Sequence, residues 1–197
     1  MRNLTAAANS LGYPLVMKIV AEEITHKSDV GGVKLNLRDE RDLLAAYDNI
    51  AASVARLPQK IGTWSVMLEP MISGGREVVM GLTADPVFGS LVMVGMGGIY
   101  VEVLKDVAFR LVPLTDVDVQ AMVAGLRGFP ILEGVRGEAP VHLATLYNQL
   151  SRLSALSAEF PEIREMDVNP FLMFPEAERC VAVDARITIG QSSGASS

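Results

Sequence analysis

The pattern of apolar and polar residues along the first sixty positions predicts two helices and two strands. The expected elements are a helix ending at residue 11, strands at 15–20 and 33–37, and a helix at 41–56. Gly12 and Pro14 stop the first helix by different backbone effects. The two strands are short apolar, β-branched runs on either side of a polar loop at 21–32. Asp39 is the candidate cap of the second helix.

The rest of the chain predicts an antiparallel sheet followed by two helices and two closing strands. The expected strands are 64–71, 76–83, 90–96, 110–114, 167–173 and 180–187, and the expected helices are 116–126 and 140–160. Paired glycines and an Asp-Pro turn separate the strands at regular intervals, which favours antiparallel pairing. Thr115 is expected to cap the first of these helices. This order of elements indicates an α+β fold, with a disordered Gly/Ser tail at 190–197.

Composition narrows the class of protein. The 197 residues are 50% apolar and 20% charged, enough to bury a core in one domain or two small lobes. A net charge of −6 and no Lys/Arg cluster argue against nucleic acid or an anionic membrane as partner. A single cysteine, Cys180, excludes a disulfide framework and a cysteine-based metal site. The longest apolar stretch, 91–101, is too short to cross a bilayer, so we expect a cytoplasmic protein.

Two features of the first strand and the loop after it suit a phosphate. The loop at 26–32 offers successive backbone N–H groups, the permissive residues Gly31 and Gly32, and Lys27 as a cation. A hairpin turn with polar decoration is the alternative, because short glycine motifs match often by chance. Lys18 lies within an apolar run, where an unpaired buried ammonium is very costly. Its partner is expected to be either a nucleotide phosphate or a structural glutamate.

Polar groups in the closing strands suit a magnesium ion. Asp167, Asn169 and Asp184 supply hard oxygen atoms, which Mg²⁺ prefers, although each of them singly also fits a solvent-facing strand position. His26 is one of two histidines, and a lone loop histidine is usually only solvated. If it is functional, its neutral imidazole could attack a phosphorus atom, with Asp167 holding the reactive tautomer.

Two acidic residues beside glycines are further candidates. Glu77 and Glu102 could face solvent or face a nucleotide or metal, and Glu77 is the stronger candidate. The run at 67–71 resembles a strand that leaves the core into a hinge. There, backbone groups and Glu69 could read an adenine edge between apolar walls, so Met71 is included among the candidate nucleotide-binding residues.

Together these motifs resemble a known family. They are Gly12-Tyr13-Pro14 with Met17-Lys18-Ile19, the loop at 26–33, and the segments 68–71, 95–99, 101–107, 167–170 and 183–186. The chain is similar over residues 6–189 to the ATP-grasp domain of NDP-forming (ADP-forming) acetyl-CoA and other acyl-CoA synthetases. These are relatives of the succinyl-CoA synthetase β-subunit.

The resemblance implies an ATP-grasp fold, with a nucleotide bound between two α+β lobes in a domain at 1–189. The smaller lobe would lack the helix and strand that open the domain in this family. The implied activity is that of an acid–thiol ligase, which interconverts acyl-CoA, ADP and phosphate with a carboxylic acid, CoA and ATP. Without its CoA-binding part, the chain is expected to be inactive in the full reaction.

The resemblance also implies roles for individual residues. Nucleotide binding falls to Lys18, Lys27, Ser28, Gly31, Gly32, Glu69, Met71 and Glu77, Mg²⁺ binding to Asn169 and Asp184, and the phosphohistidine relay to His26 with Asp167. Such a relay needs mainly positioning and charge neutralisation. The implied partner is the CoA-binding and ligase part, fused or as an α-type subunit.

Two other functions stay open at this point. The domain could be a regulatory module of an acetyl-CoA synthetase-like protein acetyltransferase, which senses nucleotide without turnover. It could also belong to an ATP-grasp ligase that makes an acyl phosphate without a histidine relay. The residues do not indicate which acid is activated, or whether ATP or GTP is preferred.

Overall fold

The computed structural model describes residues 2–24, 27–58, 61–98 and 103–190. The chain divides into two compact units, Met1–Ser73 and Gly74–Ser197, which we call unit 1 and unit 2. Each unit has its own sheet and its own cluster of buried apolar side chains. The expected α+β class is therefore confirmed in both units, and each is described below by itself.

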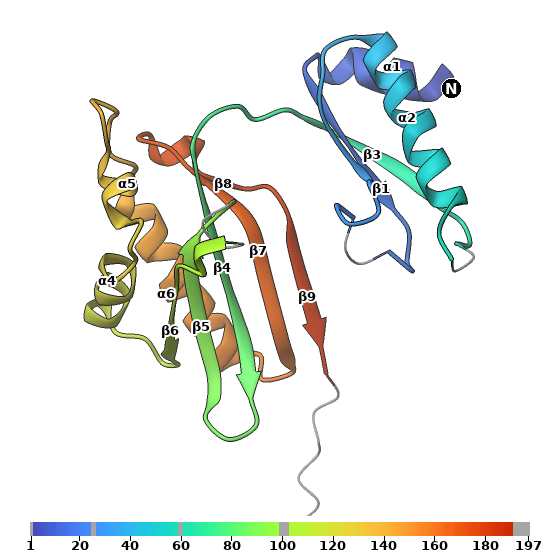
Figure 1. Cartoon of the computed structure of the whole chain (residues 1–197). Coiled ribbons are helices and arrows are strands. Elements are labelled where there is room, and N and C mark those ends of the chain that lie inside the picture. The colour runs from blue at the N-terminus through green and yellow to red at the C-terminus, as the bar shows by residue number, and fades with distance from the viewer. Residues whose placement is uncertain (1, 25–26, 59–60, 99–102, 191–197) are drawn as a thin grey trace, which may run out of the picture. The chain divides into compact units, whose positions relative to one another are not determined.

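Unit 1 is a three-stranded antiparallel sheet with two helices (Figure 1). Its elements are α1 (Arg2–Leu11), β1 (Leu15–Val20), β2 (Val33–Leu37), α2 (Glu40–Ala55) and β3 (Ser65–Pro70). The strand order is β2-β1-β3, so β1 is central and pairs with both neighbours. The cap predicted for α2 is confirmed, because the Asp39 side chain accepts the backbone N–H of Asp42 at 2.8 Å.

The period of two along β1 decides which side chains enter the core of unit 1. Leu15, Met17 and Ile19 are fully buried and pack in one cluster with residues of α1, α2 and β2. Successive side chains of a strand point to opposite faces, so Lys18 lies on the face away from these helices. Lys18 is nevertheless only 5% exposed, which makes it a buried cation that needs a partner.

Unit 2 is built on a larger antiparallel sheet (Figure 1). Its strands are β4 (Arg76–Asp85), β5 (Gly89–Met96), β6 (Val107–Leu111), β7 (Ile163–Met173), β8 (Val181–Ala182) and β9 (Ala185–Ile189). The order is β6-β5-β4-β7-β8, and β9 pairs with β7 as well. The long strand β7 thus joins the first hairpin of the unit to the closing segment.

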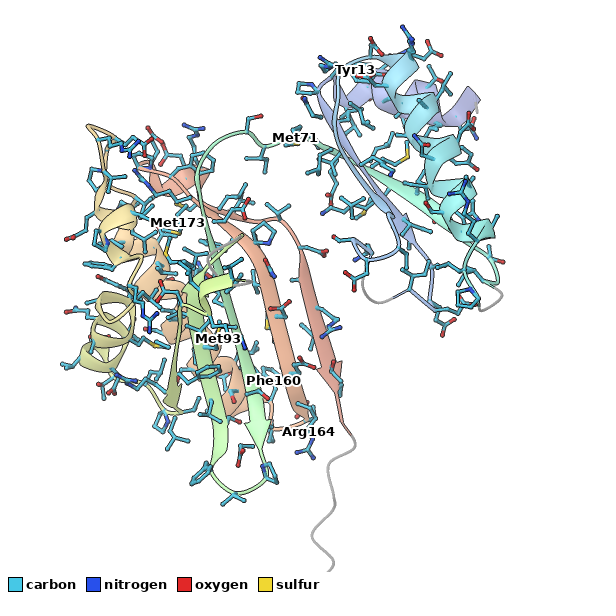
Figure 2. All side chains as sticks on the ribbon, viewed as in Figure 1. Tyr13, Met71, Met93, Phe160, Arg164 and Met173 are labelled. Atoms are coloured by element: carbon cyan, nitrogen blue, oxygen red, sulfur yellow. The ribbon has the colours of Figure 1, made fainter. Side chains whose placement is uncertain are left out.

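The helices of unit 2 lie on one face of this sheet, as Figure 1 shows. They are α4 (Asp116–Ala124), α5 (Phe129–Glu133) and α6 (Leu143–Glu159), and a single 3₁₀ turn, η1 (Ala177–Arg179), follows β7. Apolar residues of β4, β5 and β7 pack against α4 and α6 in one buried cluster. The predicted Thr115 cap is confirmed as a full capping box, in which Thr115 and Asp118 bond reciprocally. Figure 2 shows Met173, at the end of β7, inside this unit, where it is fully buried.

Two predictions about unit 2 need correction, and one of its helices was not predicted. The strand expected at 110–114 is instead β6, Val107–Leu111, because it pairs with Leu91–Gly95 and Pro113 cannot donate a ladder hydrogen bond. The strand expected at 180–187 is interrupted at Val183–Asp184 and forms β8 and β9. The short helix α5 was not predicted. Most of the expected tail, 191–197, lies outside the described residues.

Candidate functional site

Lys18 and Glu69 form an ion pair in unit 1. Register places Glu69 of β3 opposite Val16 of β1, two residues from Lys18 along β1 and therefore on the same face of the sheet. The Lys18 Nζ atom lies 2.7 Å from Glu69 Oε2, and 6% of the lysine side chain and 34% of the glutamate side chain are exposed. Of the two partners expected for Lys18, the structure therefore shows the glutamate. The partly exposed Glu69 carboxylate thus lies on the solvent side of the buried ammonium.

The predicted phosphate loop is a closed turn between β1 and β2. The N–H of Gly31 donates to the Ser28 carbonyl at 3.0 Å, and that of Gly32 donates to the Lys27 carbonyl at 2.8 Å. In this conformation neither glycine N–H points outward to a ligand. The Gly32 carbonyl accepts the Ile19 N–H at 2.7 Å, so the loop is tied to the strand that carries Lys18.

Gly32 of this loop is required by packing. A Cβ atom there would lie 2.3 Å from the Ile19 side chain and 2.9 Å from the Lys27 carbonyl, closer than real Cβ contacts.

The loop is also bordered by Glu23, whose carboxylate accepts the N–H of Gly62 at 3.0 Å. That hydrogen bond lowers the pKa of Glu23, so the carboxylate stays ionised beside the loop.

Met71 follows β3 at the end of the sheet where β1 begins. Its backbone N–H donates to the Pro14 carbonyl at 2.9 Å, which continues the β1–β3 ladder by one residue. Figure 2 shows Tyr13 and Met71 in this part of unit 1. Because the Met71 N–H is already bonded, its predicted role at an adenine edge would fall to its carbonyl or its side chain.

Glu77 lies near the start of β4 in unit 2, on the sheet face away from the helices. Its neighbour Val78 is fully buried, so alternation directs the exposed Glu77 to the opposite face. The Glu77 carbonyl accepts the N–H of Gly97 at 2.7 Å. A Cβ at Gly97 would lie 2.6 Å from the Glu77 Cβ, closer than real Cβ contacts, whereas one at Gly98 would lie 3.1 Å from Glu77 Oε2, at the end of a flexible side chain. The close approach of the two strands therefore requires glycine at position 97.

Asn169 and Asp184, the predicted magnesium ligands, are opposite each other. The Asn169 N–H donates to the Asp184 carbonyl at 3.1 Å, and the neighbouring Val183 N–H donates to the Pro170 carbonyl at 3.0 Å. The β4–β7 register shifts at this point, between Val78 and Met80. A bulge of this kind turns side chains away from the regular alternation. The described residues contain no group of three or more His, Cys, Asp or Glu that could hold a metal alone.

Asp167 occupies the middle of the sheet in unit 2. Register places it between Gly81 of β4 and Arg186 of β9, and the side chain is partly buried. A Cβ at Gly81 would lie 2.3 Å from the Met166 carbonyl, so only glycine permits this close pairing. His26, the predicted relay residue, lies outside the described residues, as does Glu102.

One buried acid was missed by the sequence reasoning. Asp106, just before β6, is 6% exposed and accepts the N–H groups of Arg127 and Gly128 at 2.8 and 2.7 Å. It lies in the segment 101–107 that contributes to the family resemblance, but as an acid beside an apolar strand it resembles an ordinary strand-flanking polar residue and was given no role. Within the described part of the chain, no helix has the length and apolar character needed to cross a membrane.

Comparisons with known proteins define the class. A family model described as an ATP-grasp domain matches residues 2–189, and the chain therefore belongs to the ATP-grasp family. Acetate–CoA ligase (ADP-forming) I subunit beta of Pyrococcus furiosus is 41% identical over 182 residues, which cover 92% of this chain and 78% of the relative. The chain thus matches the ATP-grasp domain of ADP-forming acetyl-CoA synthetase β subunits, which confirms the resemblance and the predicted fold.

Single-chain relatives are longer. The 4-hydroxybutyrate–CoA ligase (ADP-forming) of Nitrosopumilus maritimus is 42% identical over 181 residues, and the chain spans 26% of its length. A solved structure of the dinucleotide-forming acetyl-coenzyme A synthetase 1 of Ca. Korarchaeum cryptofilum, with coenzyme A and Ca-AMPCP, superimposes with a TM-score of 0.87. It is 37% identical and is matched over 95% of this chain and 81% of that one. Another structure of that enzyme holds Mg-AMPPCP, with a phosphohistidine segment pointing towards the nucleotide-binding site.

Proposed function

We propose that this chain is the nucleotide-binding component of an ADP-forming acyl-CoA ligase. It would transfer a phosphoryl group between a histidine and ADP. The observation that carries the proposal is the Lys18–Glu69 pair, with its ammonium buried in the central strand. Burying a charge is costly, and the resemblance assigns both residues to the nucleotide. A nucleotide phosphate would be a second anionic partner for the Lys18 ammonium, beside Glu69.

The metal in this proposal is Mg²⁺, held by Asn169 and Asp184. The fit is supported by two adjacent hard-oxygen donors at an irregular point of the sheet. One Asp184 carboxylate oxygen accepts the Ala185 N–H at 3.0 Å, which orients the group. When bound, Mg²⁺ would neutralise charge on the nucleotide phosphates. Two protein ligands are the number that a phosphate-bound Mg²⁺ ordinarily uses, since it keeps waters and phosphate oxygens as the others.

The phosphoryl transfer is assigned to His26, with Asp167 as its supporting carboxylate. In the direction of ATP formation, a terminal oxygen of ADP attacks the phosphorus carried on the imidazole. The new O–P bond forms as the N–P bond breaks, and the bonding electron pair returns to the ring nitrogen. Cationic groups near the phosphates lower the barrier by stabilising the charge of the transition state.

The proposed partner is a CoA-binding and ligase part, either fused to this chain or separate. Its support comes from relatives of both kinds, the Pyrococcus furiosus β subunit and the longer single-chain ligases. Alone, the chain is expected to bind nucleotide without completing the acyl-CoA reaction.

The first experiment is calorimetry of Mg-ADP and Mg-ATP binding. We expect Lys18→Met to weaken binding at least tenfold, because it removes a charge-assisted contact. Arg41→Gln is the matched control, because it also removes one positive charge from unit 1, at an exposed position on α2. Equal affinities for the wild type and the Lys18→Met variant would contradict the proposed nucleotide site.

The relay is tested separately with radiolabelled ATP. The chain has only two histidines, so His142→Ala is the natural control for His26→Ala. His142 begins α6, where its Nδ1 atom lies 2.8 Å from the Thr145 hydroxyl. We expect acid-labile label in the wild type and in His142→Ala, and none in His26→Ala. Label that survives in His26→Ala would show that the relay assignment is wrong.

A further inference from the structure

The strand β6 forms an open edge of the sheet in unit 2. The strand order places it at one end of the sheet, and within the described residues it pairs only with β5. The pairing of Leu91–Gly95 with Val107–Leu111 runs without a register shift. The edge strand β2 of unit 1 is irregular by contrast, and Asn36 there has φ of 57°. A regular edge strand is a template on which another strand can pair.

The hydrogen bonds at both ends of β6 show which of its backbone groups face outward. The Met96 N–H donates to the Asp106 carbonyl at 3.1 Å, and the Val112 N–H donates to the Ser90 carbonyl at 2.9 Å. Residues of an antiparallel strand bond alternately to one side and the other, so the even-numbered residues from 106 to 112 bond to β5. The odd-numbered residues of β6 therefore direct their N–H and C=O groups away from β5.

Two further hydrogen bonds agree with this orientation. The Phe109 carbonyl accepts the Arg110 guanidinium at 2.9 Å, and the Val107 N–H donates to the Lys105 carbonyl at 3.0 Å. Both groups are thus directed away from β5. The Phe109 carbonyl keeps a second lone pair for another donor, whereas the Val107 N–H is already used.

The side chains of the outward-facing residues are apolar and exposed. Val92 lies opposite Arg110 and is fully buried against the helices of unit 2. Alternation therefore places Phe109 and Leu111 on the opposite, open face of the sheet, where they are 48% and 50% exposed. The same residues thus offer both backbone hydrogen-bonding groups and apolar surface.

This edge is complementary to itself. A two-fold axis at Phe109 would place β6 of a second copy antiparallel to it. Phe109 of each copy would then pair with Phe109 of the other, and Val107 of each with Leu111 of the other. The Phe109 residues would exchange hydrogen bonds, and each Leu111 N–H would donate to a Val107 carbonyl. All of these side chains would lie on one face of a continuous sheet.

We propose that the β6 edge binds a second copy of this chain by antiparallel strand pairing centred on Phe109. A half-exposed phenylalanine offers only about 100 Å² of side-chain surface. The contact is therefore smaller than the roughly 1,200–2,000 Å² of a standard interface, and we expect a reversible dimer with a Kd of roughly 10–100 μM. A two-fold axis uses each contact twice, which favours a second copy as the occupant of so small a surface.

The charge of the chain adds a condition. Each copy has a net charge of −6, so two copies repel each other at low ionic strength. The strand Val107–Leu111 itself contains no acidic residue. Screening by about 0.5 M NaCl should therefore strengthen the dimer. The inference makes no use of the nucleotide site, so it is independent of the proposed function.

The test is sedimentation velocity of the full chain at roughly 1–500 μM, a range that brackets the expected Kd. Phe109→Lys places like charges on both sides of the axis and should weaken the dimer about tenfold or more. Phe160→Lys is the matched control, because Phe160 is 44% exposed at the end of α6 (Figure 2) and should leave the dimer unchanged. Leu111→Pro removes an outward N–H without removing a bond to β5, so it should also weaken the dimer.

A cross-link tests the register directly. Directly opposite residues of an antiparallel pair have Cα atoms about 5.5 Å apart, which a disulfide can span. In a Cys180→Ser background, Phe109→Cys should form a disulfide-linked dimer under mild oxidation, and Phe160→Cys should not. Absence of that cross-link, or a dimer that Phe109→Lys leaves intact, would overturn the inference. A wild type that stays monomeric at every concentration would overturn it as well, and would leave the edge to a different chain.

Discussion

The two units treat charged residues in different ways. In unit 1, a cation sits in the middle of the central strand and is neutralised there by Glu69. In unit 2, the candidate polar residues lie where the sheet is irregular, as at the bulge near Asn169 or the Gly97 turn beside Glu77. The small sheet therefore carries a buried ion pair on the face away from its apolar cluster, whereas in unit 2 the predicted metal ligands lie at a break in the regular strand pairing.

The sequence contains one tryptophan and one cysteine, and they allow the unfolding of the two units to be followed separately. The only tryptophan, Trp64, is in unit 1, where its ring lies 5.6 Å from that of Tyr47. The only cysteine, Cys180, is in unit 2, half-buried with its sulfur against the backbone of Phe174. Tryptophan fluorescence and thiol labelling thus report on different units of one chain.

The largest effect on stability is expected from a substitution that creates a cavity in unit 2. Leu150 of α6 is fully buried, and Leu150→Ala should lower the free energy of unfolding by about 2–5 kcal/mol. In a urea titration, thiol labelling of Cys180 should begin at a lower urea concentration than in the wild type, while the midpoint of the Trp64 fluorescence transition stays unchanged. Val117→Ala, at a 75% exposed position on α4, is the matched control and should be nearly neutral. An equal shift of the Trp64 transition would show that the units unfold together.

A smaller effect is expected from breaking the ion pair of unit 1. Glu69→Gln removes the negative charge that lies 2.7 Å from the buried Lys18 ammonium, and should destabilise unit 1 by about 3 kcal/mol. Lys18→Met should cost less, because the Glu69 side chain keeps 34% of its surface exposed and can be solvated. Both are measured by Trp64 fluorescence in urea. If Lys18→Met destabilises unit 1 more than Glu69→Gln does, the difference in burial between the two side chains does not determine which substitution costs more.

The smallest effect on stability is expected from lowering the pH. The backbone N–H of Arg38 lowers the pKa of Asp42, and the Thr115 hydroxyl lowers that of Asp118. Each carboxylate therefore stabilises its unit above the ordinary pKa of 3.8, and this contribution is lost as the pH falls through the lowered folded-state pKa.

An NMR titration that follows the carboxyl carbons would measure the pKa of Asp42 and that of Asp118. Hydrogen bonds are the largest cause of both shifts, but the charges of Arg38 and Arg41 also lower the pKa of Asp42, whereas only that of Arg110 lowers the pKa of Asp118. The pKa of Asp42 should therefore rise more with salt. Equal salt dependence would contradict this difference between the two helix starts.

Local signals in the sequence were sufficient for most elements, and long-range pairings were not. Asp39 and Thr115 cap their helices as predicted, because capping depends on residues three positions apart. The partner of Lys18 stayed open, since Glu69 is distant in sequence and only the β1–β3 register brings the two together. The five-residue α5 is too short to show periodicity. Asp106 was missed because its partners lie 21 and 22 residues further along the chain.

The β2 strand, finally, has a consequence for solubility. It is an edge of the small sheet, and edge strands invite pairing with the strands of other molecules. Its ladder with β1 is irregular between Leu15 and Met17, and Asn36 has φ of 57° at this irregularity. Lys34 within the strand and Arg38 after it add positive charge along the edge. A bent, charged edge is a poor template for a further strand, so the β2 edge should resist edge-to-edge aggregation even at high protein concentration.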